Sequence, residues 1–223
     1  MDKRNYLLNA TEEEEFSYNL SQSKEFQEIM NNCKCAIEEV GTKLRVLDYD
    51  FSLHYENNPI ESIETRLKSI KSIIEKLKRR KLPLSLEAIK NNIFDIAGVR
   101  VICAFENDVY SIVKAIKKQN DIKVIRETNY IDNPKTNGYR SYHLIVIIPI
   151  FLNSGKIDCP VEIQFRTIAM DFWASLEHKL RYKKELITDL EIQKRLLNCA
   201  KVAEHLDKEM QYLKDLIALK NIQ

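Results

Sequence analysis

Two carboxylates, Asp95 and Glu162, occur where the local hydrophobic pattern favours apolar side chains. Asp95 stands at the entry to the apolar run of DIAGVRVICAF, and Glu162 lies in VEIQFRT on the strand face opposite Val161. Two carboxylates from different strands can hold Mg²⁺ on a polyphosphate, and one of them can accept a hydroxyl proton. A turn or helix cap for Asp95 and an ion pair for Glu162 are the structural alternatives.

A row of basic and hydroxyl side chains precedes these carboxylates. A helix predicted from Ser62 to Arg80 places Lys68, Ser72 and Lys76 on one face, and the basic run KLKRRK ends it. Such groups can donate charge-assisted hydrogen bonds to the oxygens of a triphosphate. A solvated basic face is the alternative, since lysine is a good exposed helix former.

A third group of polar residues lies in NPKTNGYRSYH, ahead of the apolar run LIVIIPI. The Asn137-Gly138 pair predicts a turn, after which Tyr139, Ser141 and His143 should project from one strand face. An aromatic ring there can stack on a base, and Tyr139→Phe should then be tolerated. Packing with one satisfied hydrogen bond is the alternative for Tyr139 and His143.

Four short runs of β-branched and aromatic residues must position these side chains: IAGVRVICAF, IKVIRE, YHLIVIIPIF and PVEIQFRT. A helix is predicted between the first two runs, at 109–118, and an amphipathic helix at 25–47. The pattern is helical again after Phe172, with an apolar stripe from Leu190 to Ile217 that must be buried on something. Strands mixed with helices in this way predict an α/β or α+β domain.

The composition is that of a globular protein, with 44% hydrophobic and 30% charged residues. Thirty-five Lys and Arg against 33 Asp and Glu leave a formal charge of +2. This balance argues against a protein that works by covering nucleic acid with positive charge.

The cysteines and the N-terminus bear on the compartment. Five cysteines without a CxxC pair predict free thiols, most of them buried. We find no signal-peptide pattern at the N-terminus and no apolar run of eighteen residues, so a cytoplasmic protein that does not contact membranes is expected.

The motifs DIAGVRV, NGYRSYH, PVEIQFRT and AMDFWASLEHKLRYK, in this order, resemble the synthetase domain of the RelA/SpoT family. They span 95–184, and NPIESIETRLK extends the resemblance upstream. The chain length is similar to that of the small alarmone synthetases, which transfer pyrophosphate from ATP to the 3′-hydroxyl of GDP or GTP.

The resemblance implies an α/β (α+β) fold, with a mixed sheet of about five strands flanked by helices, as in nucleotidyltransferases. It also implies a helical extension at 1–61, a catalytic domain at 62–184 and a C-terminal helical extension at 185–223 that serves oligomerisation. A homotetramer with Mg²⁺ as cofactor is expected on the same ground.

Roles at the ATP side follow from the same resemblance. Asp95 and Glu162 would bind Mg²⁺, and Glu162 would also act as general base on the acceptor's 3′-hydroxyl. Arg66 and Arg100 would hold adenine between their guanidinium planes. The ATP phosphates would be bound by Lys68, Ser72 and Lys76.

For the acceptor, the resemblance implies that Tyr139 stacks on guanine, with Lys135, His143 and Gln164 near the nucleotide. Asp171 departs from the Asn of some family members, which leaves its contact with guanine open. We find no adjacent His-Asp pair, which the family's alarmone hydrolases need, so hydrolase activity is not expected.

Two alternatives remain at this point. An enzyme of the same fold could transfer pyrophosphate to another acceptor, such as the 3′ end of tRNA. A non-catalytic RNA-binding protein could use the same basic residues and Tyr139, although the small net charge and the two carboxylates argue against it. The preferred acceptor among GMP, GDP and GTP is also open.

Overall fold

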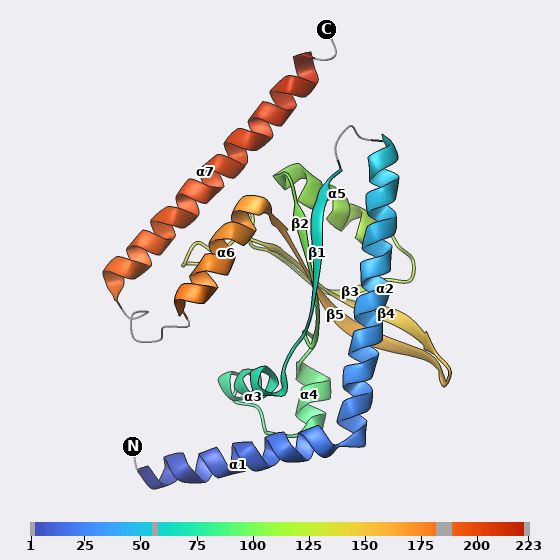
Figure 1. Cartoon of the computed structure of the whole chain (residues 1–223), viewed down its shortest axis with the longest axis vertical. Coiled ribbons are helices and arrows are strands. Elements are labelled where there is room, and N and C mark those ends of the chain that lie inside the picture. The colour runs from blue at the N-terminus through green and yellow to red at the C-terminus, as the bar shows by residue number, and fades with distance from the viewer. Residues whose placement is uncertain (1–2, 55–57, 182–188, 221–223) are drawn as a thin grey trace.

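A mixed five-stranded sheet forms the centre of the protein (Figure 1), in a computed structural model that describes residues 3–54, 58–181 and 189–220. The strand order is β1-β2-β5-β4-β3. Strands β2 and β5 are parallel, and the other neighbours are antiparallel. The strands are β1 (Ile60–Leu67), β2 (Ala97–Cys103), β3 (Lys123–Asn129), β4 (Tyr142–Leu152) and β5 (Gly155–Thr167). The predicted fold class is confirmed.

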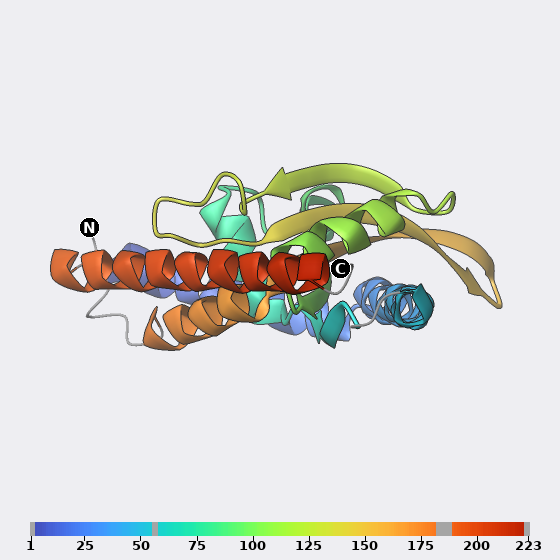
Figure 2. The ribbon, with the colours of Figure 1, turned by 90° about the horizontal axis from the view of Figure 1, so that it is seen from above.

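Helices flank this sheet on both sides (Figures 1 and 2), with α2 on one side and the pair α6 and α7 on the other. The helix predicted at 109–118 corresponds to α5, and the one predicted at 25–47 is part of the longer α2. The helices are α1 (Lys3–Gln22), α2 (Lys24–His54), α3 (Ile70–Arg79), α4 (Leu86–Asn92), α5 (Glu106–Lys117), α6 (Ile168–Arg181) and α7 (Leu190–Lys220). Within the described stretches, every helix is too short or too polar to cross a lipid bilayer.

The main hydrophobic core lies between α2, α5 and one face of the sheet. On β5, Val161, Ile163 and Phe165 are fully buried, and on α2 Val40 and Leu44 are fully buried as well. Complete burial of one such side chain stabilises the fold by about 1.5–3 kcal/mol. Because strand residues alternate between faces, the polar residues between these positions must lie on the opposite face of the sheet.

The predicted helix from Ser62 to Arg80 is wrong in its first part. Residues 60–67 form β1, which pairs antiparallel with β2, so Arg66 lies on a strand. The helix α3 begins only at Ile70, after Ser69, whose hydroxyl accepts a hydrogen bond from the Ser72 backbone N–H. The backbone of β2 offers hydrogen-bond partners to this segment, and that pairing overrides the local helical pattern.

The predicted turn at Asn137-Gly138 is confirmed, and it packs against the C-terminal helix. Gly138 has a φ of +89°, and its N–H donates to the carbonyl of Lys135 over 2.8 Å. A Cβ atom at Gly138 would lie 2.4 Å from the Ala200 Cβ and 3.2 Å from Leu197 Cδ1 of α7. Only glycine therefore allows α7 to approach this turn so closely.

Gly138→Ala is expected to destabilise the protein through backbone strain of about 1–3 kcal/mol and a steric clash of about the same size. The matched control is Gly155→Ala, because Gly155 has a φ of +114° but no atom within 4 Å of the added Cβ. Urea unfolding of both variants separates the two effects, since the control should show strain alone. Equal losses of unfolding free energy would contradict a steric role for α7.

Candidate active site

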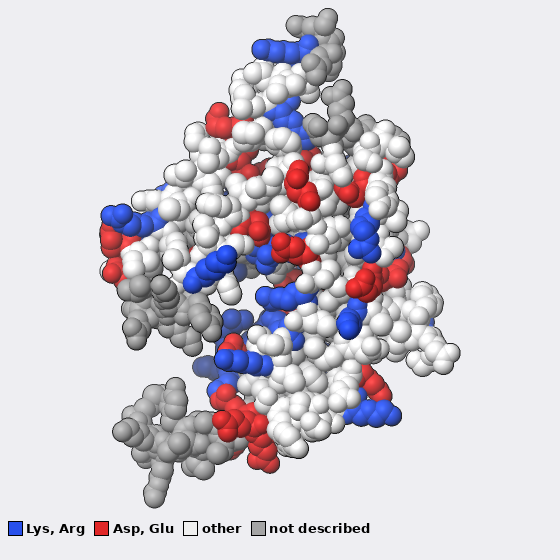
Figure 3. Space-filling model, in the orientation of Figure 1, with Lys and Arg blue, Asp and Glu red and all other residues white. Residues whose placement is uncertain are grey.

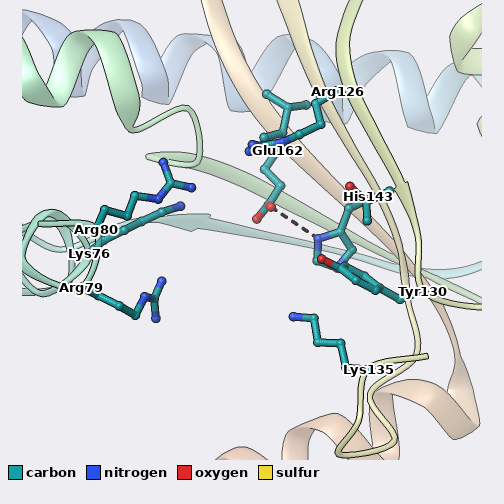
Figure 4. A pocket seen from close by; sticks show the side chains of 10 residues that line it. Lys76, Arg79, Arg80, Arg126, Tyr130, Lys135, His143 and Glu162 are labelled. Atoms are coloured by element: carbon teal, nitrogen blue, oxygen red, sulfur yellow. Dashed lines mark ion pairs between the residues drawn. The ribbon is translucent and has the colours of Figure 1, made fainter. Parts of the chain in front are cut away.

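Two cavities lie on the polar side of the sheet, and Glu162 lines both of them. The first, here called the basic cavity, has a volume of about 470 Å³ and receives side chains from α3, β3 and β4 (Figure 4). The second, the strand cavity, has a volume of about 260 Å³ and lies over β1, β2 and β5. Lys and Arg side chains surround the hollow between α6 and α3 (Figure 3). The two cavities can therefore each hold one anionic ligand, with Glu162 between them.

Asp95 is held by two lysines. Its Oδ2 atom lies 2.8 Å from Lys68 Nζ and 2.5 Å from Lys76 Nζ, and all three side chains are about nine-tenths buried. Burial opposes ionisation of Asp95, but the hydrogen bonds from Lys68 and Lys76 outweigh it, and the pKa of Asp95 lies below its ordinary value. Burial lowers the pKa of Lys76 despite its contact with Asp95. The carboxylate is therefore charged at neutral pH.

Glu162 is anchored through both of its oxygens. Oε2 accepts a hydrogen bond from the Gln164 amide over 2.8 Å, and Oε1 lies 3.4 Å from His143 Nδ1 (Figure 4). Burial raises the pKa of Glu162, but contacts with His143 and Gln164 outweigh it, and the pKa lies below its ordinary value. A charged carboxylate that two neighbours orient can accept a proton from a bound hydroxyl.

The two arginines expected to bind adenine lie on adjacent strands. Arg66 of β1 is opposite Gly98 of β2, and Arg100 of β2 is opposite Glu64 of β1, so both side chains line the strand cavity. Arg100 Nη1 is 3.1 Å from the Glu64 carboxylate and 3.4 Å from Asp171. The pairing of β1 with β2 thus brings together two guanidinium groups that are distant in the sequence.

Three rings form an aromatic group beside the basic cavity. The ring centroids of Tyr130, Tyr139 and His143 are 5.3–5.9 Å apart, in edge-to-face arrangements. The Lys135 ammonium lies 4.6 Å from the Tyr130 centroid and 4.7 Å from that of Tyr139. Lys135, Tyr130 and His143 also line the cavity. The group offers a cation and aromatic faces to a planar ligand.

The predicted site residues come together, with the exception of Ser72. Asp95, Glu162, Arg66, Arg100 and Gln164 line the strand cavity, and Lys76, Lys135 and His143 line the basic cavity with Glu162. Tyr139 is next to the latter group through its contact with His143. Lys68 reaches Asp95, whereas Ser72 lines neither cavity and its hydroxyl accepts from Ser69 over 3.0 Å.

The sequence suggested that Tyr139, Ser141 and His143 project from one strand face, but Ser141 lines neither cavity. It is fully buried, and its hydroxyl donates to the Phe165 carbonyl. The strand β4 begins only at Tyr142. The alternation of a strand therefore does not extend back over Tyr139 and Ser141.

Three polar residues that line the basic cavity could not be recognised from the motifs: Arg126, Thr128 and Tyr130. Their spacing of two along IKVIRETNY is the signal that could have found them. It was weak because β3 lies at the edge of the sheet, where buried residues do not mark one face clearly. Arg79 and Arg80, which the sequence gives only as part of a basic helix end, also line this cavity.

The two carboxylates fit a Mg²⁺ ion that is also held by phosphates. Asp95 and Glu162 both line the strand cavity, and the buried Asp95 Oδ1 has no hydrogen-bond partner. Among the described residues there is no group of three or more His, Cys, Asp and Glu that could hold a metal alone. Mg²⁺ needs no such group, since it usually binds one or two carboxylates together with waters and substrate phosphates.

Comparison with known proteins agrees with this geometry. The family model described as "Region found in RelA / SpoT proteins" matches residues 65–187. The GTP pyrophosphokinase YwaC of Bacillus subtilis is 40% identical over 181 residues, which are 81% of this chain and 86% of that protein.

Two solved structures of small alarmone synthetase 1 from B. subtilis also match. The one bound to its product pppGpp has a TM-score of 0.80 and 34% identity, and covers 87% of this chain and 99% of its own. The one bound to AMPCPP has a TM-score of 0.73 and 31% identity, and covers 88% and 99%. The similarity therefore extends over most of the chain.

Proposed function

This chain belongs to the RelA/SpoT family, and we propose that it transfers pyrophosphate from ATP to the 3′-hydroxyl of GDP or GTP, which yields AMP and ppGpp or pppGpp. The observation that carries this function is the position of Glu162 in the wall of both cavities. A carboxylate at that point can contact an acceptor on one side and a donor on the other. The similar synthetase bound to pppGpp and to AMPCPP supports the same pair of ligands.

We place ATP in the strand cavity, with adenine between Arg66 and Arg100. A planar guanidinium can stack on a base, which an ammonium cannot do. The phosphates would extend towards the basic side chains of α3, since Lys76, Arg79 and Arg80 all line the adjoining basic cavity. Lys68 would assist through Asp95, and a direct phosphate contact of Ser72 would require its hydroxyl to leave Ser69.

We place the guanine nucleotide in the basic cavity. The ring of Tyr139 would stack on guanine, with Lys135, His143 and Gln164 close by. Arg126 would supply positive charge for the acceptor's own phosphates, because it lines the same cavity. Asp171 is engaged by Arg166 and Arg100 through Oδ1, and a contact with guanine would use one of its remaining lone pairs.

In this mechanism Glu162 accepts the proton of the 3′-hydroxyl, and the resulting oxygen attacks the β-phosphorus of ATP while AMP leaves. Asp95 and Glu162 would hold Mg²⁺, which neutralises charge on the phosphates when bound. Lys76, Arg79 and Arg80 would stabilise the negative charge that develops on the transferred group. Hydrolysis of the product is not expected of this site.

The exposed apolar residues of α6 and α7 support a homo-oligomer, and we propose a tetramer. They remain exposed in the single chain, at 53–63% for Phe172, Leu206, Met210 and Ile217. The predicted stripe is thus buried only around Ala200. We propose that the C-terminal extension 185–223 serves oligomerisation of the catalytic domain 62–184. The predicted N-terminal extension 1–61 instead contributes α2 to the main core, and the sheet itself begins at Ile60. The five free cysteines suit a cytoplasmic enzyme.

An assay with labelled ATP tests the function. The protein is incubated with Mg²⁺, ATP carrying the label on its γ-phosphate, and GMP, GDP, GTP or tRNA. Transfer of label to GDP or GTP is expected. Transfer of label to tRNA, without transfer to GMP, GDP or GTP, would show that the acceptor has been assigned wrongly.

Arg100→Ala is expected to raise the KM for ATP about tenfold, because one of the two planes that hold adenine is lost. The KM for GTP should change little. Arg126→Ala is the matched variant, because Arg126 lines the basic cavity but not the strand cavity. It should raise the KM for GTP and change the KM for ATP little. Initial rates with each nucleotide varied in turn measure both constants, and equal effects on the two nucleotides would indicate a structural role for Arg100.

A further inference from the structure

A buried arginine beside the active site has no part in the roles described above. Arg166 of β5 lies on the same strand face as Glu162 and Gln164, and its side chain is only 7% exposed. Its Nη1 donates to Asp171 Oδ1 over 2.8 Å, and its Nη2 donates to Tyr139 Oη over 2.9 Å. Because burying a guanidinium is costly unless it is paired, these contacts must keep Arg166 in one position.

Arg166 at one end and the Glu162 carboxylate at the other favour one direction for a hydrogen-bonded chain through Tyr139 and His143. A guanidinium can only donate, so Tyr139 Oη accepts from Arg166 and keeps its own proton for another partner. The Glu162 carboxylate can only accept, which favours the tautomer of a neutral His143 with its proton on Nδ1 and lets Nε2 accept from Tyr139 Oη, 2.9 Å away. When Nε2 accepts, the proton of the neutral imidazole resides on Nδ1. That atom faces Glu162 Oε1 at 3.4 Å, a distance that catalytic contacts commonly shorten once substrate binds.

We propose that Arg166, the Tyr139 hydroxyl and His143 form a chain that orients Glu162, with Arg166 and Tyr139 as positioning residues; this rests on the proposed function of Glu162. His143 holds one oxygen of the carboxylate and Gln164 holds the other. Each oxygen keeps a second lone pair, so one of them can still accept the acceptor's proton.

Tyr139 therefore has two separable functions. Its ring face stacks on guanine, and its hydroxyl acts on the base through His143. The two functions predict different kinetic effects. Loss of the ring weakens acceptor binding, whereas loss of the hydroxyl alone leaves the ring in place and misorients Glu162 in the transition state. A purely structural role for the hydroxyl predicts reduced stability and unchanged kcat.

The first test is Tyr139→Phe, assayed with whichever acceptor the wild-type enzyme uses. Stacking alone would leave this variant with wild-type activity, whereas the chain predicts that kcat falls about tenfold, with the KM values for ATP and acceptor within twofold of wild type. The matched control is Tyr142→Phe, which removes a hydroxyl that donates to Glu127, away from the site. The control should retain wild-type kcat.

The second test is a double-mutant cycle with His143→Gln. If the hydroxyl acts only through His143, adding Tyr139→Phe to His143→Gln should cause no further loss of kcat. The conservative variant His143→Asn, whose amide nitrogen can replace Nδ1, should retain more kcat than His143→Gln. Independent losses in the cycle would overturn the chain.

The outcomes separate the inference from the proposed function. Wild-type transfer to GDP or GTP together with an unchanged kcat in Tyr139→Phe overturns the chain and leaves the function intact. Transfer to tRNA alone would contradict the proposal that a guanine nucleotide is the acceptor. The kcat values of wild type and Tyr139→Phe, measured with tRNA, would then still decide whether the chain orients Glu162. Because Tyr139→Phe and His143→Asn leave the pair of Arg166 with Asp171 in place, neither comparison depends on a variant that removes the buried arginine.

Discussion

Glu162→Gln is expected to lower kcat by about two to four orders of magnitude, the usual contribution of a general base, while the protein folds normally. The carboxamide has the size of the carboxylate but neither its charge nor its basicity. It also offers a single acceptor oxygen, whereas Glu162 faces two donors, the Gln164 amide and His143. Misorientation and loss of the base therefore act in the same direction.

Single-turnover rates at saturating ATP and acceptor measure this effect on the chemical step, and circular dichroism checks the fold. Glu64→Gln is the matched control, since Glu64 lines the strand cavity and pairs with Arg100 but does not contact the basic cavity. Its kcat should remain within a few-fold of wild type. A Glu162→Gln enzyme with nearly wild-type rates would remove Glu162 from the role of base.

Asp95→Asn is expected to have the second large effect, on both turnover and stability. It removes a proposed ligand of Mg²⁺, so the Mg²⁺ concentration needed for half-maximal rate should rise at least tenfold. It also leaves the ammonium groups of Lys68 and Lys76 without their carboxylate in a largely buried site. Breaking a buried pair in this way typically costs about 3–5 kcal/mol.

The lowered pKa of Asp95 predicts the direction in which stability changes with pH. Folding lowers the pKa of Asp95, so its stabilising effect is complete above its unfolded pKa of about 4 and is lost as the pH falls through the folded value. In Asp95→Asn that acid-dependent loss should disappear. Raising the pH should instead restore part of the stability, because burial already favours the neutral form of Lys76.

Urea unfolding between pH 3 and pH 10 measures these changes in wild type and variant. Asp158→Asn is the control, because Asp158 forms only an exposed pair with Lys156, at 3.5 Å. Such pairs contribute little to stability, so the control should follow the wild-type curve. If the unfolding free energy of both variants changed with pH in the same way, the buried ion pairs of Asp95 with Lys68 and Lys76 would not contribute to stability as proposed.

Much of the site was already determined by the sequence, because the relevant information is local. The alternation along VEIQFRT placed Glu162 and Gln164 on the face opposite Val161, and the structure confirms that face. The turn signal of Asn137-Gly138 was also correct. Periodicity and turn chemistry depend on neighbouring residues only, so they can be read from one chain segment at a time.

The tertiary structure alone decided the contacts between segments. It made residues 60–67 an edge strand rather than a helix, because β2 supplies hydrogen-bond partners that are 30 to 43 residues away in the sequence. It directed Lys68 and Lys76 to Asp95, and Arg166 to the hydroxyl of Tyr139. These contacts join residues of different segments, which become neighbours only when the chain folds. The periodicity within one segment cannot predict the distance between side chains of two segments.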